Sequence, residues 1–210
     1  MAANREIGTD DGNAPNGRTR WRVFALMLLG SFSAIALMLT GLSKGAVAAN
    51  FAVSGVTYKA SADELVAEGV AQFGAYDKGS GEKNHPVLVN AFKHAELSNF
   101  CQSFVVPDLP GIGDATVRIE APGGMAAQRL VLGVEKVKGD LTLNNVQIGR
   151  DASQLDLGPE GVGGSPGAFG IQATGARIDG LRQQAWSTTA STLNLRDVEI
   201  TTKPGHHPCF

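Results

Sequence analysis

The sequence has little charge, few aromatic side chains and only two cysteines. Charged residues make up 18% of its 210 positions and aromatic residues 6%. Residues 1–48 hold five basic and three acidic side chains, which leaves 13 basic and 17 acidic residues of the totals of 18 and 20 for the rest. A mildly acidic stretch without a cluster of lysines and arginines is a poor match for a polyanion, so we expect no nucleic-acid partner.

The composition does not indicate long solvated helices either. Such helices are rich in charged side chains, whereas this chain combines low charge with 27 glycines. Glycine favours turns and weakens helix interiors, so the composition predicts many turns and strands. We therefore expect a mainly β fold after the N-terminal region.

Only one long apolar run is present, Val23–Leu42, and it contains no charged side chain. Its length of about 20 residues is enough for a helix to cross a bilayer. Arg18, Arg20 and Arg22 precede it, and such a positive flank stays on the cytoplasmic side. The polar residues 1–22 are therefore predicted to form a disordered cytoplasmic N-region.

The end of residues 23–48 leaves two alternatives open. Small residues at Ala46-Val47-Ala48 match a signal-peptide cleavage site, with the cut between Ala48 and Ala49. Alternatively, the segment is an uncleaved anchor, and the plasma membrane is then a partner through Val23–Leu42. Both alternatives export residues 49–210, to the cell surface or to the extracellular space.

Downstream, short stretches alternate apolar with polar residues, which is typical of strands. One pattern repeats: Leu141–Ile148 (LTLNNVQI) and Leu193–Ile200 (LNLRDVEI) place apolar residues at the same four positions. It fits either a tight hairpin or a corner between successive strands. We therefore expect a β-solenoid-like or a β-sandwich domain. A short helix that begins at Ser61–Glu64 is weakly favoured over a turn between strands.

Cys101 and Cys209 lie on the exported side of the apolar run. An even number of cysteines in an oxidising compartment predicts one disulfide between them. Because Cys209 is the penultimate residue of the sequence, the bridge would hold a segment that otherwise frays.

The stretch Gly163–Gly167 (GGSPG) matches the hydrolase pattern G-x-S-x-G. Candidate triad partners follow Ser165 in the usual order, namely Asp179 or Asp197 and then His206 or His207. However, Pro166 has no N–H to contribute to an oxyanion hole, and the motif lies in a Gly/Pro-rich loop. The default expectation is therefore a flexible loop, with a nucleophilic Ser165 as the alternative.

The pair His206-His207 stands next to Cys209. Adjacent residues rarely ligate one ion together, and Cys209 is better used in a disulfide. We expect no metal site and no cofactor.

Several stretches resemble a family of uncharacterised actinobacterial exported proteins. The matching stretches are Phe51–Gly55 (FAVSG), Phe92–Leu97 (FKHAEL), Ile148–Ser153 (IGRDAS), Leu181–Trp186 (LRQQAW) and Cys209-Phe210. The resemblance spans residues 18–210. Members often carry the label "cholesterol esterase", which implies a lipid-ester hydrolase but brings no accepted catalytic residues.

Taken together, these features predict a non-enzymatic cell-envelope or secreted β-rich protein with a structural or binding role. A membrane protein or a lipid is the expected partner. Two alternatives remain open. One is an exported lipid esterase that uses Ser165, and the other is a lipid-binding module whose apolar interior holds a ligand.

Overall fold

The computed structural model describes residues 21, 27–28, 52–53, 56–79 and 84–210. Contacts divide the chain into two units, Met1–Val47 and Ala48–Phe210. Apart from Met27 and Leu28, which are helical, the predicted membrane segment lies outside the described residues, as does the predicted cleavage site between Ala48 and Ala49. Within the described part of the chain, none of the helices has the length and apolarity needed to cross a membrane.

The second unit is built from antiparallel strands and one short 3-10 helix. The strands are β1 (Ala52–Val53), β2 (Tyr58–Gly79), β3 (Asn84–Ser98), β4 (Phe100–Leu109), β5 (Gly113–Ala121), β6 (Met125–Asn144), β7 (Gln147–Asp151), β8 (Phe169–Thr189), β9 (Thr192–Leu195) and β10 (Glu199–Pro204). The 3-10 helix is η1 (Ala152–Gln154). The predicted short helix at Ser61–Glu64 is wrong, because these residues belong to β2.

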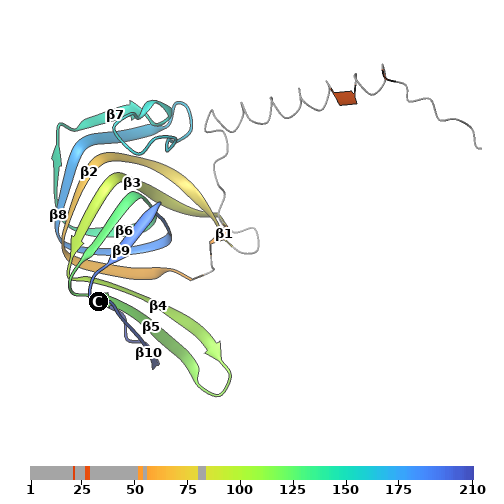
Figure 1. Ribbon diagram of the computed structural model, residues 1–210, viewed down its shortest axis with the longest axis vertical. Helices are drawn as coiled ribbons and strands as arrows, with labels where there is room; N and C mark the ends of the chain where they lie inside the picture. Colours follow the sequence, from red (N-terminus) through yellow and green to blue (C-terminus); the bar gives the residue numbers. More distant parts are fainter. Residues whose placement is uncertain (1–20, 22–26, 29–51, 54–55, 80–83) are drawn as a thin grey trace, which may run out of the picture. The chain divides into compact units, whose positions relative to one another are not determined.

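The strand pairing closes into a circuit. β2 pairs with β3, β3 with β6, β6 with β8, and β8 pairs back with the start of β2. Figure 1 shows these four long strands curling around a common interior. The mainly β prediction is confirmed. All pairings except the short β1–β2 contact are antiparallel, which fits a sandwich-like fold and not the stacked parallel coils of a solenoid.

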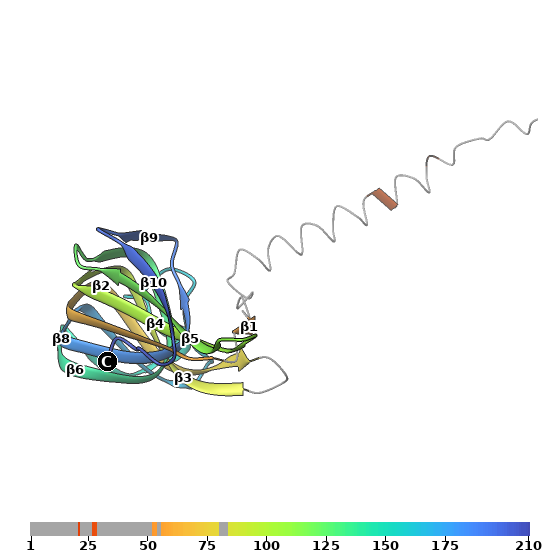
Figure 2. The ribbon, with the colours of Figure 1, turned by 90° about the horizontal axis from the view of Figure 1, so that it is seen from below.

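A second group of strands extends from this circuit. β4 pairs with β2 on one side and with β5 on the other, and β10 pairs with the far edge of β5. Figures 1 and 2 show β4, β5 and β10 running side by side. The last residues of the chain follow β10 back along this group.

The two repeats form corners and not hairpins. In each, a non-glycine residue with positive φ, Asn145 (49°) or Asp197 (56°), separates two strands that do not pair with each other. β6 and β7 both pair with β8, whereas β9 pairs with β6 and β10 pairs with β5.

The apolar repeat positions are exposed to matching degrees in the two copies. Leu141 and Leu193 are 55% and 50% exposed, and Ile148 and Ile200 are 67% and 65% exposed. The repeat pattern therefore indicates two short strands that meet at a corner, and it does not identify residues of the core.

The core between the layers is rich in alanine. About half of the buried apolar residues are alanines, and three of them, Ala67, Ala95 and Ala127, are cross-strand partners in one row over β2, β3 and β6. These alanines belong to the same cluster of buried residues as Leu181 of β8, which is the cross-strand partner of Ala62.

Gly69, in the middle of β2, should be the most sensitive glycine of this fold. Its φ is +64°, and a Cβ built on it would lie 2.5 Å from the Lys93 side chain and 2.8 Å from the Leu157 carbonyl oxygen. An L-residue in this conformation costs about 1–2 kcal/mol before any contact is counted. We expect Gly69→Ala to lower the free energy of unfolding by about 2 kcal/mol or more, measured by urea denaturation.

Gly74, in the same strand, provides the matched control. A Cβ added there would meet no atom within 4 Å. Gly74→Ala should therefore change the free energy of unfolding by less than about 1 kcal/mol. Equal losses in the two variants would contradict the role assigned to Gly69.

Candidate functional site

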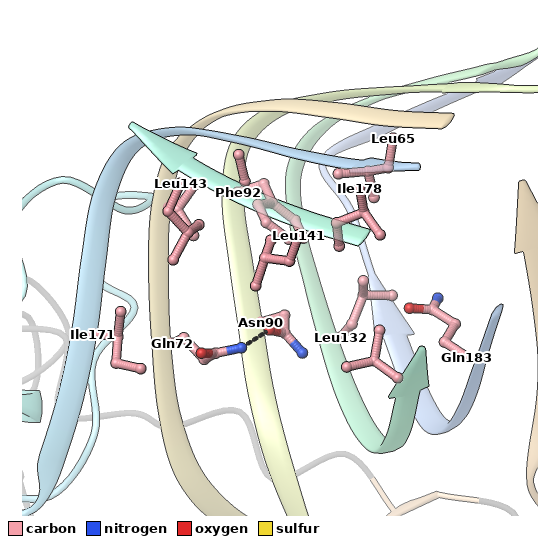
Figure 3. Close-up of a pocket in the computed structure, with 13 residues that line it drawn as sticks. Leu65, Gln72, Asn90, Phe92, Leu132, Leu141, Leu143, Ile171, Ile178 and Gln183 are labelled. Atoms are coloured by element: carbon pink, nitrogen blue, oxygen red, sulfur yellow. Dashed lines mark hydrogen bonds between the residues drawn. The ribbon is translucent and has the colours of Figure 1, made fainter. Parts of the chain in front are cut away.

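An apolar pocket of about 50 Å³ lies among β2, β3, β6 and β8. Figure 3 shows side chains converging on it from these strands. Its lining consists of apolar residues and three amides: Leu65, Val70, Phe92, Leu132, Val137, Leu141, Leu143, Ile171, Ala176 and Ile178, with Gln72, Asn90 and Gln183. None of these side chains is charged, so the pocket suits an occupant that is itself apolar or neutral.

Gly69 determines which face of β2 lines the pocket. Strict alternation would leave Leu65 and Val70 on opposite faces of the strand. The left-handed backbone at Gly69 interrupts this alternation, and both residues line the pocket. The other face of β2 is covered as well, because Gly158 of the loop after η1 packs directly on Ala71.

The outer wall comes from the paired part of β6 and β8. Leu141 pairs with Ile178 and Leu143 with Ala176, so the four side chains share one face of this ribbon. Leu141 is more than half exposed, which places it at the rim of the pocket. The ribbon of β6 and β8 thus closes the pocket on one side, and its residue Leu141 brings the pocket lining into contact with solvent.

Two of the three amides are bonded to each other. The Gln72 Nε2 group donates to Asn90 Oδ1 at 2.5 Å, and Asn90 Nδ2 donates to the Leu88 carbonyl oxygen at 3.4 Å. The Gln72–Asn90 bond, drawn as a dashed line in Figure 3, links a side chain of β2 to one of β3. The third amide, Gln183, lies on β8 and is separate from the pair.

A second, smaller pocket of about 30 Å³ adjoins the first and shares Leu65, Leu132 and Gln183 with it. The Tyr58 hydroxyl lines this second pocket and is hydrogen-bonded to the Thr188 hydroxyl. Burial raises the pKa of Tyr58 to about 12, partly offset by that bond. The two pockets thus share one wall, and neither is lined by a charged side chain.

The predicted disulfide is present. The sulfur atoms of Cys101, in β4, and Cys209 are bonded, with a Cα–Cα distance of 6.0 Å and a sequence separation of 108 residues. It fixes the segment after β10 against the β4–β5 pair.

Two buried hydroxyls hold the same segment. The N–H of Cys209 donates to Ser103 Oγ at 3.0 Å, and the N–H of His207 donates to Thr116 Oγ1, also at 3.0 Å. Thr116 Oγ1 in turn donates to the Gly205 carbonyl oxygen at 2.6 Å. These bonds explain why β4 and β5 bury polar side chains at these two positions.

The candidate triad residues are not in contact with one another. His206 Nε2 is 2.9 Å from Asp114 Oδ2, and His207 Nε2 is 3.0 Å from the Pro204 carbonyl oxygen. Asp179 is bonded to Arg177, whose pKa this bond raises. Asp197 lies in the corner between β9 and β10.

Ser165 lies in a turn that Asp151 organises. The carboxylate of Asp151 accepts from the N–H and hydroxyl of Ser153 and from the N–H of Gly167, and these bonds lower its pKa. The Ser165 carbonyl oxygen accepts from the N–H of Ala168 at 3.1 Å. The loop is therefore fixed locally by backbone bonds, and no side-chain bond links Ser165 to any of the candidate aspartates or histidines among the described residues.

The sequence analysis also considered a metal site at the pair His206-His207. In the part of the chain that the structure describes, no three His, Cys, Asp or Glu side chains are grouped so that they could hold an ion. The carboxylate nearest to His206 is Asp114, whose pKa is lowered first by the N–H of Asp108 and then by His206.

A lipid-binding module with an apolar interior was one of the open alternatives, but sequence reasoning did not identify the residues that line the pocket. Its residues come from four strands, and the pattern of each strand alone looks like an ordinary half-buried sheet. One signal was present: Gln183 occupies a position between Leu181 and Ala185, both buried, where alternation predicts an apolar side chain.

Comparison with known proteins places the chain in a protein family. The model of the family described as "Family of unknown function (DUF6230)" matches residues 54–210. Neither a curated protein nor a solved structure matches the chain significantly.

The disulfide should contribute strongly to stability. Closing a loop of 108 residues corresponds to at most about 4–5 kcal/mol of chain entropy removed from the unfolded state. We expect the double variant Cys101→Ser, Cys209→Ser to lose about 2–4 kcal/mol in urea unfolding. Reductant should lower the midpoint of the wild type and leave that of the variant unchanged. A wild-type midpoint insensitive to reductant would contradict this expectation.

Tyr58 should make stability depend on pH in the alkaline range. Its folded pKa of about 12 lies above the ordinary value of 10.0, so the fold favours the neutral phenol. The corresponding stability, on the order of 2–3 kcal/mol, is fully present below pH 10 and is lost as the pH rises through about 12. Phenolate absorbance should show one late-ionising tyrosine, which Tyr58→Phe removes and Tyr76→Phe retains. The same titration curve for both variants would refute the assignment.

Proposed function

The chain belongs to the DUF6230 family, whose function is unknown, and we propose that its β-domain is a non-enzymatic binding module for the hydrocarbon chain of a lipid. The observation that carries this proposal is the uncharged pocket enclosed by β2, β3, β6 and β8. A second, adjoining pocket with uncharged walls extends it.

The size of the pocket favours a narrow occupant. One water molecule needs about 10–15 Å³ on this measure, whereas an apolar cavity of about 150 Å³ admits benzene. A pocket of about 50 Å³ is several times larger than a water site and much smaller than the benzene cavity. The pocket therefore holds a short segment of an unbranched alkyl chain, with the rest of the chain outside it, and does not admit a sterol ring system.

The lining also favours a hydrocarbon. Apolar cavities are poor hosts for water, and removing an alkyl chain from water gains about 0.8 kcal/mol for each buried CH₂ group. The rim residue Leu141 extends the apolar surface from the pocket to the solvent. A chain that enters over this rim remains in apolar contact along its path.

The geometry gives less support to an esterase built on Ser165. Such a reaction needs Ser165, an aspartate and a histidine in hydrogen-bond sequence. His206 is instead bonded to Asp114, and Ser165 lies in the turn held by Asp151. Binding without catalysis therefore accounts better for the arrangement of these residues.

We also propose that the module works outside the cytoplasm, in the cell envelope. Two features support this: the apolar run Val23–Leu42 with its arginine flank, and the Cys101–Cys209 bridge, since disulfides persist in oxidising compartments. In this proposal the domain is tethered by the apolar run or released after Ala48. The neighbouring membrane supplies the lipid.

Leu143 and Leu195 allow a matched test of the pocket. Both are half-buried and occupy the same position of the repeat, but only Leu143 lines the pocket. We expect Leu143→Trp to fill the pocket and lower the affinity for an alkyl chain at least tenfold. Binding of dodecane, delivered from cyclodextrin, would be quantified by gas chromatography after gel filtration.

Leu195→Trp serves as the control and should retain the wild-type affinity within about twofold. The proposal fails if wild-type protein takes up no dodecane. It also fails if both tryptophan variants, folded by circular dichroism, bind dodecane as tightly as the wild type.

A further inference from the structure

Gln183 is a buried polar side chain whose amide has no hydrogen-bond partner among the described residues. Among the residues of this domain that the structure describes, four with polar side chains are buried, namely Ser103, Thr116, Gln172 and Gln183. Ser103 and Thr116 bond the segment after β10. The amide of Gln183 is not among the fully buried polar atoms without a partner, so it keeps access to the space that it lines, where another molecule can bond it.

Gln172, in the same strand, shows how this protein satisfies a buried amide. Its Oε1 accepts from the N–H groups of Asp156 and Leu157 at 2.8 and 3.2 Å. Its Nε2 donates to Gln147 and to Asp156, both at 2.9 Å. Gln172 is 1% exposed and Gln183 is 6% exposed, so burial is similar and only the partners differ.

The position of Gln183 indicates what completes its bonds. It lines both pockets and, with Leu65 and Leu132, forms the wall that they share. In Figure 3 its amide lies beside Leu132, away from the bonded pair Gln72 and Asn90. An occupant that runs from one pocket to the other therefore passes Gln183 with apolar wall on either side.

We propose that Gln183 binds a neutral polar group, an ester or a hydroxyl, that lies between two alkyl segments of the bound lipid. An amide both donates and accepts, so it can bond the carbonyl oxygen of an ester or the two sides of a hydroxyl. This inference rests on the proposed function, because it names the polar part of the same ligand.

A fatty acid carboxylate does not fit this position. Neither pocket contains a lysine, arginine or histidine side chain, so a carboxylate there would be buried without a counter-charge. A neutral group avoids that cost and satisfies the amide. The site thereby selects esters and alcohols over ionised acids of equal chain length.

Three probes of similar length separate these possibilities: dodecane, dodecanoate and hexyl hexanoate, which carries its ester in mid-chain. Each is delivered from cyclodextrin to the full-length protein at pH 8, and bound probe is quantified by gas chromatography. We expect hexyl hexanoate to bind about tenfold more tightly than dodecanoate. Gln183→Leu should weaken hexyl hexanoate about five- to tenfold and leave dodecane unchanged.

Two further variants make the test specific. Gln184→Leu is the matched control, because the Gln184 amide bonds Thr57 and Glu135 and does not line either pocket. It should leave the affinity for every probe within about twofold. Gln183→Met, which keeps an unbranched side chain, should reproduce the effect of Gln183→Leu if the leucine variant fails to fold.

Thermal unfolding without ligand gives an independent readout. Removing an unpartnered amide should raise the melting temperature in Gln183→Leu, whereas Gln172→Leu should lower it because four bonds are lost. If Gln183→Leu is less stable than the wild type, Gln183 has a structural role and the inference is overturned.

The outcomes distinguish the inference from the function on which it rests. Equal binding of ester and carboxylate, or ester binding unaffected by Gln183→Leu, overturns the role of Gln183 while dodecane binding still supports the module. Failure of all three probes, including dodecane, overturns the proposed function and this inference with it.

Discussion

The domain depends on one long strand, β2, that must satisfy several partners at once. Near its start it is hydrogen-bonded to β4 on one side and β8 on the other, and over the rest of its length it pairs with β3. A single strand of 22 residues can do this only by curling, which returns β8 to β2 and closes the circuit. The left-handed Gly69 redirects the inward side chains where the strand bends. Leu65 and Val70, on either side of Gly69, line the pocket. The course of β2 therefore closes the fold and also forms one wall of the candidate site.

Local pattern predicted the strands well and their burial less well. Alternation in Leu193–Ile200 correctly indicated two short strands with a break, but it carried no information on the burial of Ile200, which is largely exposed. Burial depends on whether another layer covers that face, and nothing within eight residues encodes this. The bridge of Cys101 and Cys209 was predictable because it follows from the compartment and the cysteine count and not from the fold. The short helix expected at Ser61–Glu64 failed because pairing with β4, β8 and β3 overrides a weak capping signal.

The pocket was beyond the reach of the sequence for a related reason. Gln172 and Gln183 have the same side chain in the same strand, and no local feature distinguishes them. The first meets backbone N–H groups of the loop after η1, and the second meets an open space between layers. The difference arises from segments far away in the chain, namely residues 156–157 in one case and β2 with β6 in the other. Sequence reasoning about Ser165 met the same limit, because a triad motif gives an order of residues and not their distances.

The distribution of buried polar groups connects stability with function. Where β4 and β5 bury hydroxyls, the segment ending at Cys209 completes their bonds, and the disulfide holds that segment in place. Where β8 buries Gln172, the loop after η1 and Gln147 of β7 complete its bonds. The interior thus completes the bonds of the other three buried polar side chains, whereas a leucine in place of Gln183 would need no partner at all. Retaining an unpaired amide lowers stability, which is the pattern expected of a residue whose partner is a ligand. The disulfide, contributing on the order of several kcal/mol, offsets that loss, and neither of its cysteines lines the two pockets.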